Sequence, residues 1–150
     1  MIREIITYPN KLLRTKSKDV EDFNSELHTL LDDMYETMIA ASGVGLAAIQ
    51  IAVPLNVLII NPINEEDIQD KNDLIEAINP KITHKDGELV YQEGCLSVPG
   101  FYEDITRAKH IVVEYFNRFG EKQTMECEDF LAVAWQHEME HLSGHVFIEN

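Results

Sequence analysis

The sequence predicts an α+β fold in a single domain that covers residues 1–150. Two observations carry this prediction. Apolar residues recur at helical spacing near both ends of the chain, at 25–41 and 129–143, and short strand patterns separated by turn residues lie between them. A chain of 150 residues is also long enough to bury one substantial core.

The composition limits the classes of function. The chain carries 12 basic and 27 acidic residues, a net charge of −15, which argues against binding nucleic acid or an anionic membrane through charge. No apolar run is long enough to span a bilayer, and the first residues lack the apolar core of a signal peptide. We therefore expect a cytoplasmic protein whose 2 cysteines are ligands or core residues rather than a disulfide.

The first half of the chain contains one helix and a small-residue motif. After an irregular start, an amphipathic helix is predicted over 25–41, and the run G-V-G-L-A-A-I-Q follows at 43–50. This run fits a helix stop that leads into a buried strand. It equally fits a backbone held close to a ligand, with Gln50 directing a hydrogen bond inward.

The middle of the chain is dominated by strand patterns. An apolar run at 56–62 predicts a buried strand, and the acidic stretch 64–73 predicts a surface loop. Two strand pieces, 74–78 and 81–84, are expected to be broken at Asn79-Pro80, with His84 in the turn that follows.

Two further strand segments precede the C-terminal helix. A strand that begins near 88 should run into Gly94 and stop near Pro99. The segments 105–116 and 122–127 are predicted to form a hairpin.

The most informative stretch lies in the helix predicted at 129–143, which stops at Gly144. In its H-E-M-E-H pentamer, His137 and His141 are four residues apart, so both imidazoles can reach one metal ion. Glu138 projects where its carboxylate can reach a water on that metal. The pentamer alone also fits an exposed, charged helix end, but the apolar residues before it favour a buried helix.

A catalytic metal site needs a third protein ligand. Few residues follow His141, too few for the later helix that supplies a glutamate in thermolysin-like peptidases. The metzincin position for a third histidine is Phe147, and His145 is expected to be a surface residue. The ligand must therefore come from upstream, where the candidates are Cys95, Cys127, His28, His84 and His110. Cys95 has the most distinctive surroundings, whereas Cys127 has no motif around it and is interpreted as structural.

Three motifs together resemble those of peptide deformylases. That family carries G-x-G-x-A-A-x-Q, E-G-C-L-S and Q-H-E-x-D-H, and this chain has G-V-G-L-A-A-I-Q, E-G-C-L-S and Q-H-E-M-E-H in the same order. Glu140 stands where the family usually has aspartate, and Tyr102 stands where some members have an arginine. Bacterial members commonly continue with a further helix beyond the point where this sequence stops, and all three motifs lie before that point.

The resemblance implies a metal-dependent hydrolase that removes the formyl group from N-formylmethionine at the start of newly made polypeptides and releases formate. It implies that Cys95, His137 and His141 bind the metal and leave a fourth position open for water. Glu138 would transfer the proton. The donors implied for the oxyanion, besides the metal, are the Gln50 side chain and the backbone N–H of Leu96.

A pocket for the methionine side chain is also expected. Helical spacing places Val133, Ala134 and Phe130 on the side of the helix that carries His137, although plain core packing explains each of them equally well. Gly45 is expected to pair its backbone with the substrate as an added strand, and Glu93 to support the site from behind. The further substrate-binding residues implied by the resemblance are Val44, Tyr91 and Gly94.

The same resemblance supplies the arrangement and the partners. It implies small antiparallel sheets packed around a central helix at 129–143, with the 25–41 helix outside. Fe²⁺ is the expected metal in the cell, with Zn²⁺ or Ni²⁺ replacing it in purified protein. The expected partners are N-formylmethionyl nascent peptides near the ribosome, with no direct binding to nucleic acid or membranes.

Three other functions stay open at this point. A metallopeptidase would cleave unformylated internal peptide bonds. A structural zinc module would close the fourth metal position, with Cys127 as the candidate. A deformylase fold without activity would be expected to have lost Glu138, which is present here.

Overall fold

The computed structural model describes residues 1–144, so the predicted surface position of His145 lies outside the described residues. Short 3-10 helices occupy Lys11–Arg14, Ala48–Ile51 and Lys71–Asp73. The α-helices and strands are α1 (Ser25–Ala40), β1 (Gly45–Ala47), β2 (Val57–Ile60), β3 (Ile75–Asp86), β4 (Leu89–Cys95), β5 (Val98–Arg107), β6 (His110–Phe116), β7 (Lys122–Glu128) and α2 (Asp129–Leu142).

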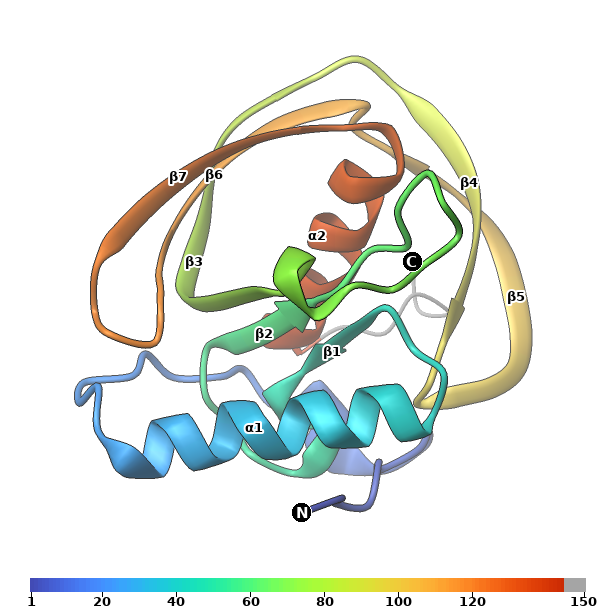
Figure 1. The fold of residues 1–150 in the computed structure, drawn as a ribbon. Coiled ribbons are helices and arrows are strands. Elements are labelled where there is room, and N and C mark those ends of the chain that lie inside the picture. Colours follow the sequence, from blue (N-terminus) through green and yellow to red (C-terminus); the bar gives the residue numbers. More distant parts are fainter. Residues whose placement is uncertain (145–150) are drawn as a thin grey trace.

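These strands form two sheets (Figure 1). The larger has five strands in the order β1-β2-β3-β6-β7, and the smaller consists of β4 and β5. Every pair of neighbouring strands is antiparallel, including the predicted β6–β7 hairpin. The α+β class with small antiparallel sheets is therefore confirmed.

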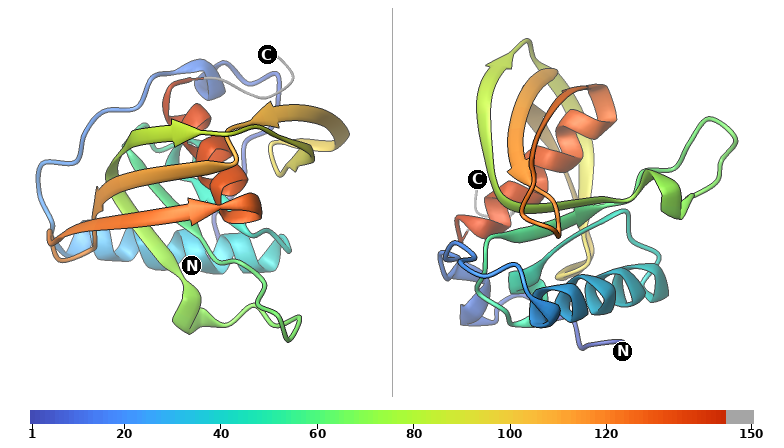
Figure 2. Two further views of the ribbon diagram at one scale, coloured as in Figure 1. Left: turned by 90° about the horizontal axis from the view of Figure 1, so that it is seen from above. Right: turned by 60° about the vertical axis from the view of Figure 1, so that its left-hand side comes forward.

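The centre of the molecule is layered, with part of the larger sheet between the two helices (Figure 2). Leu58 and Ile60 of β2 belong to the apolar cluster around Trp135 of α2, whereas Val57 and Ile59 belong to the cluster around α1. A strand that is buried on both faces has a continuous apolar sequence, and this explains the unbroken run that predicted β2.

Strand β3 continues through Asn79-Pro80, so the prediction of two separate pieces is wrong. A register shift between Ile78 and Lys81 accommodates these residues as a bulge, and Asn79 has a φ of 51°. The Asn79 side chain accepts a hydrogen bond from the Val20 N–H and donates one to its carbonyl. Proline is tolerated because a bulge does not require its missing N–H. His84 consequently lies on β3 and not in a turn.

The chain also changes sheets where one strand was predicted at 105–116. β5 ends at Arg107 in the small sheet, and β6 begins at His110 in the large one. Between them, the backbone N–H and C=O of Ala108 bond to the Gln136 side chain on α2, which takes the place of a partner strand. Val98 begins β5 where the preceding strand was expected to stop near Pro99.

Residues 89–107, here called the arm, therefore form a hairpin that leaves the large sheet after Asp86 and rejoins it at His110. In Figure 1 the arm, β4 and β5, forms the right-hand side of the molecule, with α2 between it and the strands β3, β6 and β7 of the larger sheet. Among the described residues, no helix is both long enough and apolar enough to cross a membrane.

Candidate active site

Helix α2 carries the H-E-M-E-H pentamer in a buried position. His137, Glu138 and His141 are 9%, 6% and 1% exposed, so the interpretation as a solvated helix end does not hold. The helix ends at Leu142, and Gly144 follows in a turn, with a φ of 83° and an N–H that bonds to the His141 carbonyl. A Cβ at Gly144 would lie 2.5 Å from the Arg14 carbonyl oxygen, so the glycine also allows a close backbone approach.

Cys95 reaches the two histidines because it lies at the tip of the arm. Leu96 and Ser97 form the turn, and the register shifts between Gly94 and Cys95. The Cys95 Sγ atom is 3.3 Å from His141 Nε2, which is itself 3.3 Å from His137 Nε2. Of the five upstream candidates, Cys95 is the one that the structure brings to the histidines.

The donor atoms of this group fit a divalent metal ion. Bonds of about 2.0–2.3 Å to nitrogen and sulfur place tetrahedral ligands about 3.4 Å apart, close to the separations found here. Burial and the neighbouring His137 and Arg107 hold the pKa of His141 well below its usual range, so this ring is neutral, as a ligand must be. Burial lowers the pKa of His137, but hydrogen bonds with Cys95 and Glu93 raise it to about 10, and a bound metal would replace that proton.

Cys127 has a different environment. Its side chain is 2% exposed and packs in the core cluster with Trp135 and Tyr115. Burial raises the pKa of its thiol to about 11. This residue therefore has the surroundings of a core cysteine, and it does not belong to the group of donor atoms around Cys95 among the described residues.

A buried ion pair supports His137 from behind. The His137 Nδ1 atom is 2.7 Å from Glu93 Oε1, and Arg107 donates to both Glu93 oxygens at 2.8 and 2.9 Å. Arg107 also pairs with Glu140, the one position that departs from the motif. Burial opposes ionisation of Glu93, but the bonds from Arg107 and His137 leave its pKa below the usual range. A carboxylate at this nitrogen fixes the orientation of the ring and leaves Nε2 for a metal.

Glu138 lies against the β1 backbone. A Cβ at Gly45 would be 2.6 Å from Glu138 Oε2, so a side chain there would displace the carboxylate. Burial raises the pKa of Glu138 to about 7, although His137 opposes the rise. Its Oε1 atom is buried without a hydrogen-bond partner among the described residues. A carboxyl group with this pKa and a free acceptor atom suits proton transfer at neutral pH.

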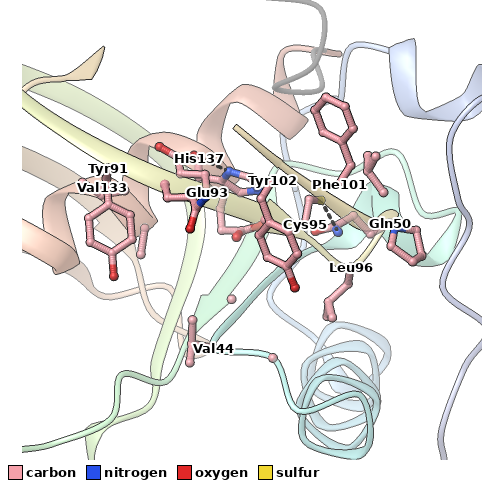
Figure 3. Close-up of a pocket in the computed structure, with 18 of the residues that line it drawn as sticks. Val44, Gln50, Tyr91, Glu93, Cys95, Leu96, Phe101, Tyr102, Val133 and His137 are labelled. Carbon is pink, nitrogen blue, oxygen red and sulfur yellow. Dashed lines mark hydrogen bonds and ion pairs between the residues drawn. The ribbon is translucent and has the colours of Figure 1, made fainter. Parts of the chain in front are cut away.

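The Gln50 side chain lies on the side of Cys95 that is opposite His137 (Figure 3). Its Oε1 atom accepts from the Ala47 N–H at 2.9 Å, while its Nε2 atom faces Ser97 Oγ at 3.1 Å and Cys95 Sγ at 3.6 Å. This side chain is 1% exposed. The amide is therefore fixed with its donor group beside Cys95.

These groups meet at one cavity of about 560 Å³. The cavity lies between β1, the arm and α2, and Figure 3 shows its walls. His141 does not line it, but all the other predicted site residues do: Val44, Gly45, Gln50, Tyr91, Glu93, Gly94, Cys95, Leu96, Phe130, Val133, Ala134, His137 and Glu138.

Several residues of this region were not predicted from the sequence. Arg107 belongs to none of the three motifs. It contacts Glu93, 14 residues earlier in the sequence, only because the two strands of the arm pair as a hairpin. Ser97 is the last residue of the E-G-C-L-S motif, and the sequence predicted no role for it. Phe101 and Tyr102 line the cavity from the opposite strand of the arm, and a Cβ at Gly94 would lie 2.6 Å from the Tyr102 ring. The Tyr102 ring therefore packs directly against the Gly94 backbone, and a side chain at position 94 would have to displace it.

Comparison with known proteins identifies the family. A family model described as polypeptide deformylase matches residues 2–150. The chain belongs to the peptide deformylase family. It is 57% identical over 150 residues to the peptide deformylase of Campylobacter jejuni, covering 99% of this chain and 86% of that one.

Solved structures of the family have the same fold. A peptide deformylase from Legionella pneumophila matches with a TM-score of 0.94 at 41% identity, over 99% of this chain and 85% of that one. The peptide deformylase of Ehrlichia chaffeensis, solved in complex with actinonin, matches with a TM-score of 0.91 at 37% identity, over 99% and 87% of the two chains.

Membership of this family establishes the activity. The chain is a hydrolase that removes the formyl group from the N-terminal formylmethionine of newly made peptides, and the family implies a catalytic metal. The metallopeptidase and zinc-module alternatives have no support from these comparisons.

Proposed function

We propose that Cys95, His137 and His141 hold the catalytic metal and that Glu138 transfers the proton during hydrolysis of the formyl amide. The observation that carries this proposal is the convergence of three donor atoms beside a buried carboxyl group at the wall of one cavity. We further propose Fe²⁺ as the metal in the cell, with Zn²⁺ or Ni²⁺ replacing it in purified protein, because a thiolate and two imidazoles suit all of these ions.

The chemistry divides between the metal and the side chains. When bound, the metal ion supplies Lewis-acid polarisation and makes a water molecule a stronger nucleophile near neutral pH. Glu138 accepts the proton of the attacking water and delivers it to the nitrogen of the departing amine. Gln50 Nε2 and the Leu96 backbone N–H donate to the carbonyl oxygen as its negative charge develops. Formate and a free N-terminal amine result.

The substrate is proposed to lie along β1 with its methionine in the apolar part of the cavity. β1 is an edge strand of the large sheet, so its free side, at Gly45, can pair with an extended peptide. The Tyr91 and Phe130 rings contact each other at 5.6 Å between centroids and close one wall. The other residues proposed to contact the substrate are Val44, Glu93, Gly94, Val133 and Ala134.

We also propose that residues 1–150 form a single catalytic domain that works in the cytoplasm near the ribosome. Formylmethionine is present at the start of nascent chains, so the substrate is available there. The net charge of −15 supports an encounter through the peptide itself rather than through direct binding to nucleic acid or membrane.

The deciding experiment measures formate release by anaerobically purified, Fe²⁺-loaded protein. We expect formate from a formyl-Met peptide and no cleavage of the same peptide when it carries an acetyl group or a free amine. Folded, metal-loaded protein that releases no formate, or that cuts internal bonds of the unformylated peptide, would contradict the proposal.

The contact between Gly45 and Glu138 gives a second test. Gly45→Ala should lower kcat for formate release by about 10²-fold, because the added methyl group displaces the carboxylate from its position. Metal content and thermal unfolding are measured on the same sample. Unchanged kcat with full metal content would show that the position of Glu138 does not limit the reaction.

Removing the metal should make the two cysteines differ in their rate of alkylation. In the metal-loaded protein we expect neither thiol to react with iodoacetamide. After chelation, Cys95 should become alkylated, whereas Cys127 stays protected by its burial and by a pKa of about 11. Peptide mapping by mass spectrometry gives the two rates. Equal alkylation of Cys95 with and without metal would exclude it as a ligand.

A further inference from the structure

A second group of metal-binding side chains lies away from the active site. His84, Asp86 and His110 each offer one donor atom, and these three atoms all lie within 4.8 Å of one another. His84 Nε2 is 2.6 Å from Asp86 Oδ2, and His110 Nδ1 is 3.1 Å from the same oxygen. We call these residues the arm-base cluster.

Strand geometry explains why these side chains meet. Asp86 and His110 are direct partners in the β3–β6 register, so their side chains share one face of the sheet, and His84 precedes Asp86 by two positions on that face. Ile111 and Val113 of β6 point the other way, into the core cluster with Trp135. The arm-base cluster therefore lies on the outer face of the sheet, opposite the face that packs against α2.

The ligand atoms of this cluster favour some metal ions over others. Two imidazole nitrogens with one carboxylate oxygen suit Zn²⁺, Ni²⁺ or Cu²⁺, whereas Mg²⁺ and Ca²⁺ prefer sets made of oxygen alone. Ligand atoms around a zinc ion stand about 3.4 Å apart, so the two separations from Asp86 Oδ2, 2.6 and 3.1 Å, need only a small outward shift. The two imidazole nitrogens lie within 4.8 Å of each other. His84 and Asp86 side chains are 55% and 56% exposed and are free to make that shift.

A fourth residue orients the cluster. The His110 Nε2 atom is 2.6 Å from Glu126 Oε1 on β7, so this ring donates to a carboxylate with one nitrogen and turns the other toward Asp86. Histidines that bind metals commonly have such a carboxylate on the nitrogen that faces away from the ion. His110 is also the least exposed member, at 19%, so the ring is already held in place.

The position of the cluster gives a bound ion a structural role. Asp86 is the last residue of β3, and His110 is the first residue of β6, so they flank the two crossings where the arm leaves and rejoins the large sheet (Figure 1). The arm carries Glu93 and Cys95. An ion held by both strands would tie these crossings together.

We propose that the arm-base cluster binds one divalent ion, Zn²⁺, Ni²⁺ or Cu²⁺, through His84 Nε2, Asp86 Oδ2 and His110 Nδ1. This ion holds together the two crossings between the arm and the large sheet. This site is separate from the Cys95 group and does not depend on the function proposed for that group.

The test begins with protein that carries one equivalent of Ni²⁺ and is then dialysed against buffered micromolar Zn²⁺. Zinc and nickel are both counted per chain by mass spectrometry of the metals. We expect one Zn²⁺ gained with no Ni²⁺ lost, and a higher unfolding temperature in the presence of zinc. Zinc gained only in proportion to nickel lost, or no zinc gained, would overturn the proposal.

Variants identify where the ion binds. The double substitution His84→Gln and His110→Gln should abolish zinc uptake and the rise in unfolding temperature, while nickel content and formate release stay unchanged. His28→Gln, a histidine that contacts the Arg118 carbonyl elsewhere, is the matched control and should bind zinc normally. Glu126→Gln should raise the zinc Kd by about 10-fold or more, since it weakens the group that orients His110. Full zinc uptake by the double variant would contradict the assignment.

Discussion

Replacing Glu138 with glutamine should lower the rate of formate release by about 10²–10⁴-fold, the usual contribution of a positioned proton-transfer group. Glutamine preserves the shape of the side chain but cannot take a proton from water. Burial already raises the pKa of Glu138 to about 7, so a neutral amide at this position should cost little stability. The expected result is a folded, metal-loaded protein that turns over slowly.

Two measurements separate this outcome from a trivial loss of the site. Metal content of the Glu138→Gln variant should equal that of the parent, since the three proposed ligands are unchanged. Glu26→Gln, which removes an exposed carboxylate from the first turn of α1, should leave the rate unchanged. A Glu138→Gln variant within about threefold of the parent rate would remove Glu138 from the proton-transfer step, since such a small loss is far below the effect of a catalytic base.

Local sequence patterns predicted the elements of this fold well, because each pattern reports packing along one segment. The spacing of Leu27, Leu30 and Leu31 predicted α1, and the unbroken apolar run of β2 matches a strand covered on both faces. The errors occur where a distant segment decides the local structure. Gln136 on α2 ends β5 by bonding to Ala108, and Val20 supports the bulge at Asn79. Neither partner can be recognised from the neighbouring sequence.

The candidate site shows the same contrast between residues related within one segment, which the sequence predicts, and residues brought together from distant segments, which it does not. The pentamer on α2 predicted His137, Glu138 and His141 as candidate site residues, because helical spacing alone relates them. The residues alone left five candidates for the third ligand, and the resemblance to a family singled out Cys95, which the structure places beside both histidines. Arg107 could not be predicted by either route, since no motif contains it and its contacts arise only when β4 and β5 pair.

Replacing Arg107 therefore tests how much its buried ion pair with Glu93 contributes to the stability of the protein. Its side chain and that of Glu93 are 6% and 4% exposed, and the pair is bidentate. Arg107→Met should lower the free energy of unfolding by about 3–5 kcal/mol, because it leaves the Glu93 carboxylate buried without its cation. Urea denaturation of the metal-loaded protein measures this loss.

An exposed salt bridge serves as the control for this buried ion pair. Lys122 and Glu114 are 63% and 33% exposed, so Lys122→Met should cost less than about 1 kcal/mol. Adding Glu93→Gln to Arg107→Met should recover part of the stability, because the stranded charge is then removed as well. If the double variant is instead less stable than Arg107→Met by the full cost of a separate Glu93→Gln, the two residues act independently. The arm would then be held by its backbone pairing alone, and the ion pair would serve only to orient His137.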